Sequence, residues 1–318
     1  MLHSFILINY INNIQRFYYS MRTIILRFSL SLAVALALSG PGEAAPRSFR
    51  VDLELVLAVD VSGSIDEEEG RLQRKGYVEA FTAPEVLAAI RSGFHKRIAV
   101  IYIEWAGYEH QLTLTKWTLI HDEASARRFA SALAASPTGI GPYTSISGAI
   151  EYAMPLFKKN NFEGTRQVID ISGDGPNNSG RMVTLAREEA LRAGLTINGL
   201  PILNNRPSRY GNPPMPNLDL YYKNCVIGGP RAFLVIAESF KSFAKAIRKK
   251  LVLEIAGAMP RDRAAATVSS LRRPAYPVRY GGRQAPAAPP PTPSFKTVGK
   301  GPPCDEGERR RQSWSSDY

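Results

Sequence analysis

Short apolar runs with few polar interruptions alternate with longer amphipathic stretches between residues 52 and 256. Such a short and nearly uninterrupted apolar run is typical of a strand that is buried on both faces of a parallel sheet. Strands alternating with helices predict an α/β fold, a doubly wound and mainly parallel sheet of the Rossmann-like kind with helices on both faces. Residues 110–120 alternate polar and apolar side chains and predict one antiparallel edge strand. The parallel strands are expected at residues 53–59, 97–105, 167–172, 195–203 and 232–237.

Helix signals lie between these runs. Asp66 precedes Glu69 by three residues, which is the spacing of a capping box and predicts a helix start. Asp122 and Ser179 begin two further predicted helices, and Gly194 is the expected C-terminal cap of the second.

A last helix is predicted over residues 239–251, where apolar side chains recur on one stripe. Arg248, Lys249 and Lys250 lie near its end. We interpret them as cations that interact favourably with the negative end of the helix dipole.

The N-terminal 45 residues resemble a targeting segment. From Met21, basic residues precede an apolar run that ends near small residues suited to signal-peptide cleavage. Residues 1–20 do not fit this pattern, so Met21 is the expected start. The apolar run is about ten residues long, whereas a spanning helix needs about 20. We therefore expect an exported, periplasmic or secreted protein without a stable membrane span after cleavage, with an uncleaved N-terminal anchor as the alternative.

The formal net charge of +12 is concentrated outside the predicted folded domain, which we place at residues 46–256. Residues 257–318 carry 11 Lys and Arg against five Asp and Glu, and they are rich in Pro and Ala. This composition predicts a disordered Pro/Arg-rich tail. The remaining charge forms no basic stripe along the domain, so no nucleic-acid partner is expected.

Two cysteines are present, Cys225 and Cys304. Because Cys304 falls in the predicted disordered tail, no structural disulfide is expected, although export would permit one. Cys225 is predicted to be a small buried apolar residue. Two thiols are also too few for a thiolate metal site.

The candidate chemistry begins where the first strand ends, at Asp60, Ser62 and Ser64. Thr144 follows a Gly-rich turn and Asp174 follows a later strand, so both are expected at the same edge of the sheet, where ligands bind in such folds. Carboxylates and hydroxyls are oxygen ligands suited to a hard dication such as Mg²⁺. Taken alone, the first loop could equally be a capped helix start, but the three loops together predict a metal site.

This pattern resembles the metal-ion-dependent adhesion site of von Willebrand factor A domains, over about residues 50–253. Phrases such as "IEWAG" and "DISGDGPNN" also resemble an uncharacterised family of exported bacterial proteins of this kind. The resemblance implies that Ser62, Ser64 and Thr144 supply hydroxyls and that Asp60 and Asp174 bind the metal directly or through water. It also implies a protein partner that offers a carboxylate to the ion. Mg²⁺ is the favoured ion, with Mn²⁺ and Ca²⁺ as alternatives.

Two other functions stay open. A strand-terminal Asp with a later "GDGPNN" loop resembles haloacid-dehalogenase-like phosphatases, but Ser62 stands where that family has a second Asp, and Asn177 and Asn178 replace its later acidic residue. The alternative of a metal-dependent hydrolase is therefore weaker, and no histidine is expected near the three loops to act as a general base. In the second alternative, the Pro-, Asn- and Tyr-rich loop 204–225 recognises partners beside an idle metal site. We expect this loop to border the site, with Tyr143 at the rim.

Overall fold

The computed structural model describes residues 21, 48–204, 206–208, 211, 213–257 and 301–315. The chain divides into two compact units, Met1–Arg47 and Ser48–Tyr318, and the sheet with its surrounding helices belongs to the second unit. Apart from Met21, the predicted signal peptide and anchor lie outside the described residues. Within the described part of the chain, no helix is both long and apolar enough to cross a membrane.

The second unit is built on a mainly parallel sheet with the strand order β4-β3-β2-β7-β8. Strand β2 lies in the middle and pairs in parallel with β3 on one side and with β7 on the other. This order confirms the predicted α/β class, and it brings the carboxyl ends of β2 and β7 next to each other. The parallel strands are β2 (Leu53–Asp60), β3 (Ile98–Trp105), β7 (Gln167–Gly173) and β8 (Thr196–Pro201).

The predicted antiparallel edge is present as two short strands, β4 (Gln111–Thr113) and β5 (Thr118–Ile120), which both pair with β3. Between them the Thr115 hydroxyl accepts a hydrogen bond from the backbone N–H of Tyr102 at 3.0 Å. A side-chain oxygen thus replaces a backbone carbonyl there, and the edge strand divides into two.

The prediction of a regular strand at residues 232–237 is wrong. The segment runs beside β8 and forms only isolated bridges, such as Gly199 with Leu234. After Gly199, the next residue of β8 whose backbone faces this segment is Pro201. Because proline has no N–H to donate, a continuous ladder of hydrogen bonds cannot form there. The sequence signals also miss a small parallel pair, β1 (Phe49–Val51) with β6 (Phe162–Gly164).

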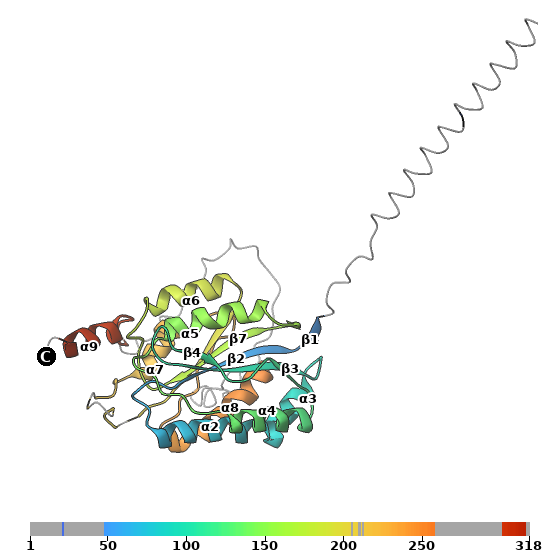
Figure 1. Ribbon diagram of the computed structural model, residues 1–318, viewed down its shortest axis with the longest axis horizontal. Helices are drawn as coiled ribbons and strands as arrows, with labels where there is room; N and C mark the ends of the chain where they lie inside the picture. The colour runs from blue at the N-terminus through green and yellow to red at the C-terminus, as the bar shows by residue number, and fades with distance from the viewer. Residues whose placement is uncertain are drawn as a thin grey trace, which may run out of the picture. The chain divides into compact units, whose positions relative to one another are not determined.

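Helices cover both faces of the sheet (Figure 1). Alternate residues of β2 enter two separate cores, with Leu55 and Leu57 in one and Val56 and Ala58 in the other, which explains the uninterrupted apolar run. On the first face lie α2 (Glu67–Phe81), α3 (Pro84–Ser92), α4 (Glu123–Ala135), η3 (Phe240–Ser242) and α8 (Phe243–Ile255). On the second face lie α5 (Ile146–Ala153), η1 (Met154–Lys158), α6 (Val183–Arg192), α7 (Leu218–Tyr221) and η2 (Tyr222–Val226).

The capping signals are confirmed at two helix starts. Asp66 and Glu69 form the reciprocal capping box of α2, and Asp122 accepts from Ser125 N–H at the start of α4. Helix α6 begins later than Ser179, at Val183. Gly194 has φ +82°, the left-handed conformation expected of a C-terminal glycine cap.

The interpretation of Lys250 as a cation that serves the negative end of the helix dipole is wrong, because its side chain is completely buried and α8 continues to Ile255. Its Nζ lies 2.6 Å from Asp170 Oδ1 of β7 and 3.2 Å from Glu254 Oε2 of α8. Asn198 of β8 donates to Glu254 Oε1 at 2.6 Å. This cluster of charged side chains links α8 to the centre of the sheet.

The buried cluster predicts a pH dependence of stability. Burial raises the pKa of Asp170 from its ordinary 3.8 to about 7, with the Lys250 charge opposing the change. Because the folded chain then binds this proton more tightly than the unfolded chain, the contribution of Asp170 to stability decreases as pH rises from about 4 to about 7. We expect the free energy of unfolding of the wild type, minus that of Asp170→Asn, to decrease over this interval in urea titrations. A difference that stayed constant or increased with pH would contradict this.

The expectation that the chain has no structural disulfide is also wrong. Cys225 of η2 is bonded to Cys304, which lies 79 residues further along the chain. After Cys304 the chain forms helix α9 (Glu306–Ser315), in place of a disordered tail over residues 301–315. No local sequence signal indicates this helix, because α9 is strongly polar and buries little of its surface.

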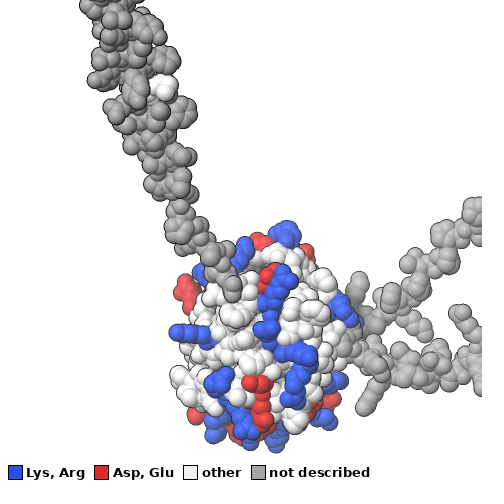
Figure 2. All heavy atoms as spheres, turned by 90° about the vertical axis from the view of Figure 1, so that its right-hand side faces the viewer, with Lys and Arg blue, Asp and Glu red and all other residues white. Residues whose placement is uncertain are grey.

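The face farthest from α9 shows no single-sign patch. Figure 2 shows Lys and Arg side chains spread over this face, with Asp and Glu side chains between them.

Candidate metal site and its pocket

The first of the three loops begins at Asp60, the last residue of β2. Ser62 donates its backbone N–H to Asp60 Oδ1 at 2.7 Å, and Ser62 Oγ lies 3.1 Å from Ser64 Oγ. Backbone bonding to β3 continues one residue further, since Val61 N–H donates to Trp105. These bonds fix the turn between strand and helix, so that the polar side chains gather at the carboxyl edge of the sheet.

The second loop joins the first through a direct side-chain contact. Ser64 Oγ donates to Asp174 Oδ1 at 2.6 Å, across 110 residues of sequence. Asp174 follows β7, the strand next to β2. Parallel pairing of the two strands therefore brings these predicted ligands together.

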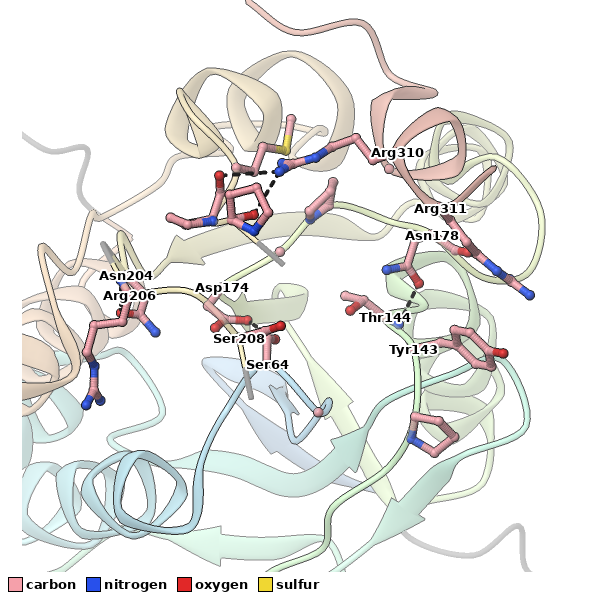
Figure 3. Close-up of a pocket in the computed structure, with 18 residues that line it drawn as sticks. Ser64, Tyr143, Thr144, Asp174, Asn178, Asn204, Arg206, Ser208, Arg310 and Arg311 are labelled. Carbon is pink, nitrogen blue, oxygen red and sulfur yellow. Dashed lines mark hydrogen bonds between the residues drawn. The ribbon is translucent and has the colours of Figure 1, made fainter. Parts of the chain in front are cut away.

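The third loop carries Thr144 and is held to both of the others. Gly141 N–H donates to the Val61 carbonyl at 3.0 Å, next to the end of β2. Asn178 Oδ1 accepts from Thr144 N–H at 2.8 Å, and Asn178 N–H donates to the Thr144 carbonyl, also at 2.8 Å. A Cβ placed on Gly175 would lie 3.8 Å from Thr144 Oγ1, so this hydroxyl lies beside the loop that bears Asp174. All three loops thus meet at one place (Figure 3).

The two carboxylates of the site are short of positive charge. Asp60 is fully buried, and its Oδ2 has no hydrogen-bond partner among the described residues. Burial raises the pKa of Asp60 well above its ordinary value, and the nearby Asp174 raises it further. Burial also raises the pKa of Asp174 to about 6, although the hydrogen bond from Ser64 opposes the change. A cation beside these groups would relieve both effects.

The donor set fits a hard dication. In the described part of the chain, no group of three or more His, Cys, Asp or Glu could hold a metal ion. The predicted set instead combines the two carboxylates with three hydroxyls, which are oxygen ligands of the kind that Mg²⁺ and Ca²⁺ accept. The buried Asp60 Oδ2, which lacks a partner among the described residues, supports this fit.

A pocket of about 550 Å³ opens above this cluster. Ser64, Thr144 and Asp174 form part of its floor, whereas Asp60 and Ser62 are buried and do not line it. The prediction that loop 204–225 borders the site is confirmed for its described residues. Its pocket-lining residues are Asn204, Arg206, Ser208, Pro213, Pro214 and Met215.

This loop is tied to the capping box of α2. Arg206 forms an ion pair with Glu69, and Asn204 donates to Glu69 Oε1 at 3.2 Å. Glu69 therefore serves both the helix start and the loop, which places the beginning of the loop beside Asp174.

Several residues of the site were not expected from the sequence. Asn178 holds the backbone of Thr144, whereas in the sequence it stands out only as the replacement of an acidic residue. Tyr222 is buried, and a Cβ on Gly173 would lie 2.9 Å from its Oη and 2.6 Å from Asp60 Oδ2. Gly173 thus allows Asp60 and Tyr222 to approach the backbone at the end of β7. The glycine in "ISGDG" was the available signal for this close approach.

The expectation that no histidine lies near the three loops is wrong. A Cβ on Gly141 would lie 2.9 Å from His110 Cγ, so this ring packs against the loop that carries Thr144. His110 comes from the turn between β3 and β4, and the Ala106 carbonyl of this turn accepts from Ser145 N–H at 2.7 Å. It does not line the pocket.

The chain matches one family model and is similar to several solved structures. The model of one family, described as "Protein of unknown function (DUF1194)", matches residues 50–259. No curated protein is similar to the chain. Similar solved structures include proximal thread matrix protein 1 from the mussel byssus, with a zinc-occupied MIDAS motif, at 14% identity, 67% of this chain, 47% of that chain and a TM-score of 0.45. A second is the pilus adhesin SpaC from Lactobacillus rhamnosus GG, at 12% identity over 64% of this chain and 31% of that chain, with a TM-score of 0.48. A third is von Willebrand factor type A from Catenulispora acidiphila, at 11% identity over 64% of this chain and 43% of that chain, with a TM-score of 0.45.

One of these three solved structures, the protein from Catenulispora acidiphila, is described as von Willebrand factor type A. The chain spans less than half the length of each of these three proteins. The fold assignment itself rests on the strand order and the connections of this chain.

Proposed function

Since the chain belongs to the family described as "Protein of unknown function (DUF1194)", which brings no activity with it, we propose a function from the site. The protein is an exported binding module that captures an acidic group of a protein partner through a divalent cation. Asp60, Ser62, Ser64, Thr144 and Asp174 would hold the ion, with Mg²⁺ favoured over Mn²⁺ and Ca²⁺. The observation that carries this proposal is the meeting of the three loops around the buried Asp60 carboxylate.

The ligand set suits capture. When bound, an ion held largely by neutral hydroxyls keeps electrophilic character and can accept a carboxylate oxygen from outside. The chain's own residues orient this site: Ser64 and Asp174 are hydrogen-bonded to each other, and Asn178 holds the backbone of Thr144. The pocket above gives a partner access to the side that faces solvent.

Capture is favoured over phosphoryl transfer by the position of Asp60. In a phosphatase of the kind that the sequence resembles, this residue would be the nucleophile and would have to reach the substrate. Here Asp60 is fully buried and does not line the pocket. Among the described residues that line the pocket, Asp174 is the only carboxylate and none is a histidine, so none of them is a separate general base facing a substrate.

Export is part of the proposal, and the disulfide supports it. Disulfides persist in oxidising compartments such as the periplasm and the cell exterior. The bond between Cys225 and Cys304 therefore agrees with the targeting segment expected from Met21 onward.

The metal site is tested by titrating the purified protein with Mn²⁺ or Mg²⁺ in a calorimeter. We expect one ion to bind, and Asp174→Asn to weaken its binding by at least about tenfold, the smaller end of the loss seen when a group that merely supports a ligand is removed. Glu163→Gln is the matched control, because it also turns a carboxylate into an amide but lies on the exposed strand β6. It should leave ion binding unchanged.

Partner capture is tested with the same variants immobilised and exposed to envelope extracts. Capture should require the divalent ion, disappear with chelator and be lost in Asp174→Asn while remaining in Glu163→Gln. A partner retained equally in chelator, or by Asp174→Asn, would show that the metal is idle and would favour recognition by loop 204–225.

A further inference from the structure

Helix α9 is fastened to the loop that follows Asp174. The disulfide holds its N-terminal approach at Cys304, and Glu308 Oε1 accepts from Asn177 Nδ2 at 2.8 Å. Gly307 lies so close to this loop that a Cβ would be 1.9 Å from the Asn177 carbonyl oxygen. The helix therefore packs against the site without room for a side chain at this position.

Helix α9 also forms a wall of the pocket. Gly307, Arg310 and Arg311 line the pocket, and Arg310 donates to the Pro213 carbonyl of loop 204–225 at 2.8 Å. The wall is absent from the resemblance that identified the three loops, which ends at about residue 253. It is thus a feature of this chain beyond the predicted metal ligands.

Arg311 occupies a special place in that wall. Its Nη1 donates to the carbonyl of Asn178 at 3.0 Å, and Asn178 is the residue that holds Thr144. Its guanidinium also lies over the ring of Tyr143, 4.2 Å from the ring centroid. Figure 3 shows Arg311, Asn178, Tyr143 and Thr144 together on one side of the pocket. A cation therefore contacts two residues that adjoin Thr144, a predicted metal ligand.

Tyr143 is held in an unusual conformation at this rim. It has φ +60°, in the left-handed region that few residues with a Cβ adopt, and its side chain is 52% exposed. Such a conformation costs free energy and persists where the surroundings hold it, often at binding sites. Here it presents the ring toward Arg311, whose guanidinium lies over the ring.

The charges that line the pocket favour a ligand with further negative charge, in addition to the one carboxylate that would bind the ion. Among the described residues, the lining carries Arg206, Arg310 and Arg311 against one carboxylate, Asp174. Arg206 is compensated by its ion pair with Glu69. The contacts described for Arg311 are to a carbonyl oxygen and a ring, neither of which carries a formal charge.

We propose that Arg311, supported by Tyr143, is a second anion contact, and that the ligand is an acidic peptide segment with at least two neighbouring carboxylates. The first carboxylate goes to the ion and the next one to Arg311. A planar guanidinium held over an aromatic ring suits a carboxylate, which can accept two parallel hydrogen bonds from it. This inference rests on the proposed function for its first contact, but its second contact is tested separately.

The test compares two fluorescein-labelled peptides, hexa-aspartate and a glycine peptide of the same length with a single Asp, by fluorescence anisotropy with Mn²⁺ present. Arg311→Gln should weaken hexa-aspartate binding by about ten- to a hundredfold, the loss of one hydrogen-bonded charge pair. Binding of the single-Asp peptide should stay the same. Arg311→Lys, which keeps the charge, should recover part of the loss.

Arg309→Gln is the matched control, because it removes the same charge from the same helix. Arg309 does not line the pocket and pairs with Asp305 and Glu306. It should bind both peptides as the wild type does, and thermal unfolding should show every variant folded.

Each other result decides against the inference. It is overturned if the wild type does not prefer hexa-aspartate, if Arg311→Gln weakens both peptides equally, or if Arg311→Lys binds as poorly as Arg311→Gln, which would mark a merely structural role. Failure of the proposed function looks different: hexa-aspartate would bind equally well in chelator, while the separate effect of Arg311→Gln would remain.

Discussion

Lys250→Met is expected to lower the free energy of unfolding by about 3–5 kcal/mol, the usual cost of removing one partner from a buried ion pair. Methionine fills a similar volume, so the loss comes from charge and not from a cavity. It leaves Asp170 and Glu254 in the core without the ammonium group that lies 2.6 Å from one and 3.2 Å from the other. The substitution also removes a cation 5.3 Å from the centroid of the Phe233 ring.

Urea unfolding followed by circular dichroism measures this loss. Arg248→Met is the control, because Arg248 lies on the same helix but is only half-buried, with 42% of its side chain exposed, and pairs with Glu85 at 3.4 Å. It should cost less than about 0.5 kcal/mol, as expected for a surface substitution. Adding Asp170→Asn to Lys250→Met should recover part of the stability, since one stranded carboxylate is then removed. If Lys250→Met were no more harmful than Arg248→Met, the buried cluster would not contribute as described.

The sequence did contain a signal for this cluster. Lys250 lies seven residues after Phe243 and three after Ile247, on the stripe that faces the core, and Glu254 lies one turn further. Asp170 interrupts the apolar run of β7. Taken singly, each is an ordinary polar residue, and only the packing of α8 on the sheet shows that they meet. Pairing between distant buried charges therefore could not be derived from local pattern.

Two of the three loops of the site were easier to place, because parallel topology determines where they meet. Once β2 and β7 are neighbours, the residues that follow them must share an edge, so Ser64 and Asp174 could be placed together without side-chain detail. Helix α9 offered no such rule. Its polar composition has no apolar stripe, and it reaches the pocket through a covalent bond between two cysteines of which one lay in an apparent tail. Nothing in the spacing of Cys225 and Cys304 indicates that they pair.

Because the disulfide between Cys225 and Cys304 holds α9 at the pocket, we expect reduction of this bond to release the helix. In the Cys304→Ser variant, or in the wild type with dithiothreitol, we expect α9 to leave the pocket while the sheet stays folded. In the chain-entropy account, a bond closing 79 residues is worth ~4 kcal/mol. Here that contribution acts mainly on docking of the helix, because the two cores of the sheet contain none of the α9 residues whose burial is described, 306–313.

Hydrogen exchange of residues 301–315, measured by mass spectrometry, reports the release directly. Protection there should fall in Cys304→Ser to near that of an unstructured peptide, while protection in β2 and β7 is retained. Because Arg311 leaves with the helix, the preference for hexa-aspartate over the single-Asp peptide should disappear as in Arg311→Gln, whereas Mn²⁺ binding at Asp174 persists. Unchanged protection of α9 after reduction would mean that contacts such as those of Gly307 and Glu308 with Asn177 hold the helix by themselves. The disulfide would then not be what keeps the second anion contact in place.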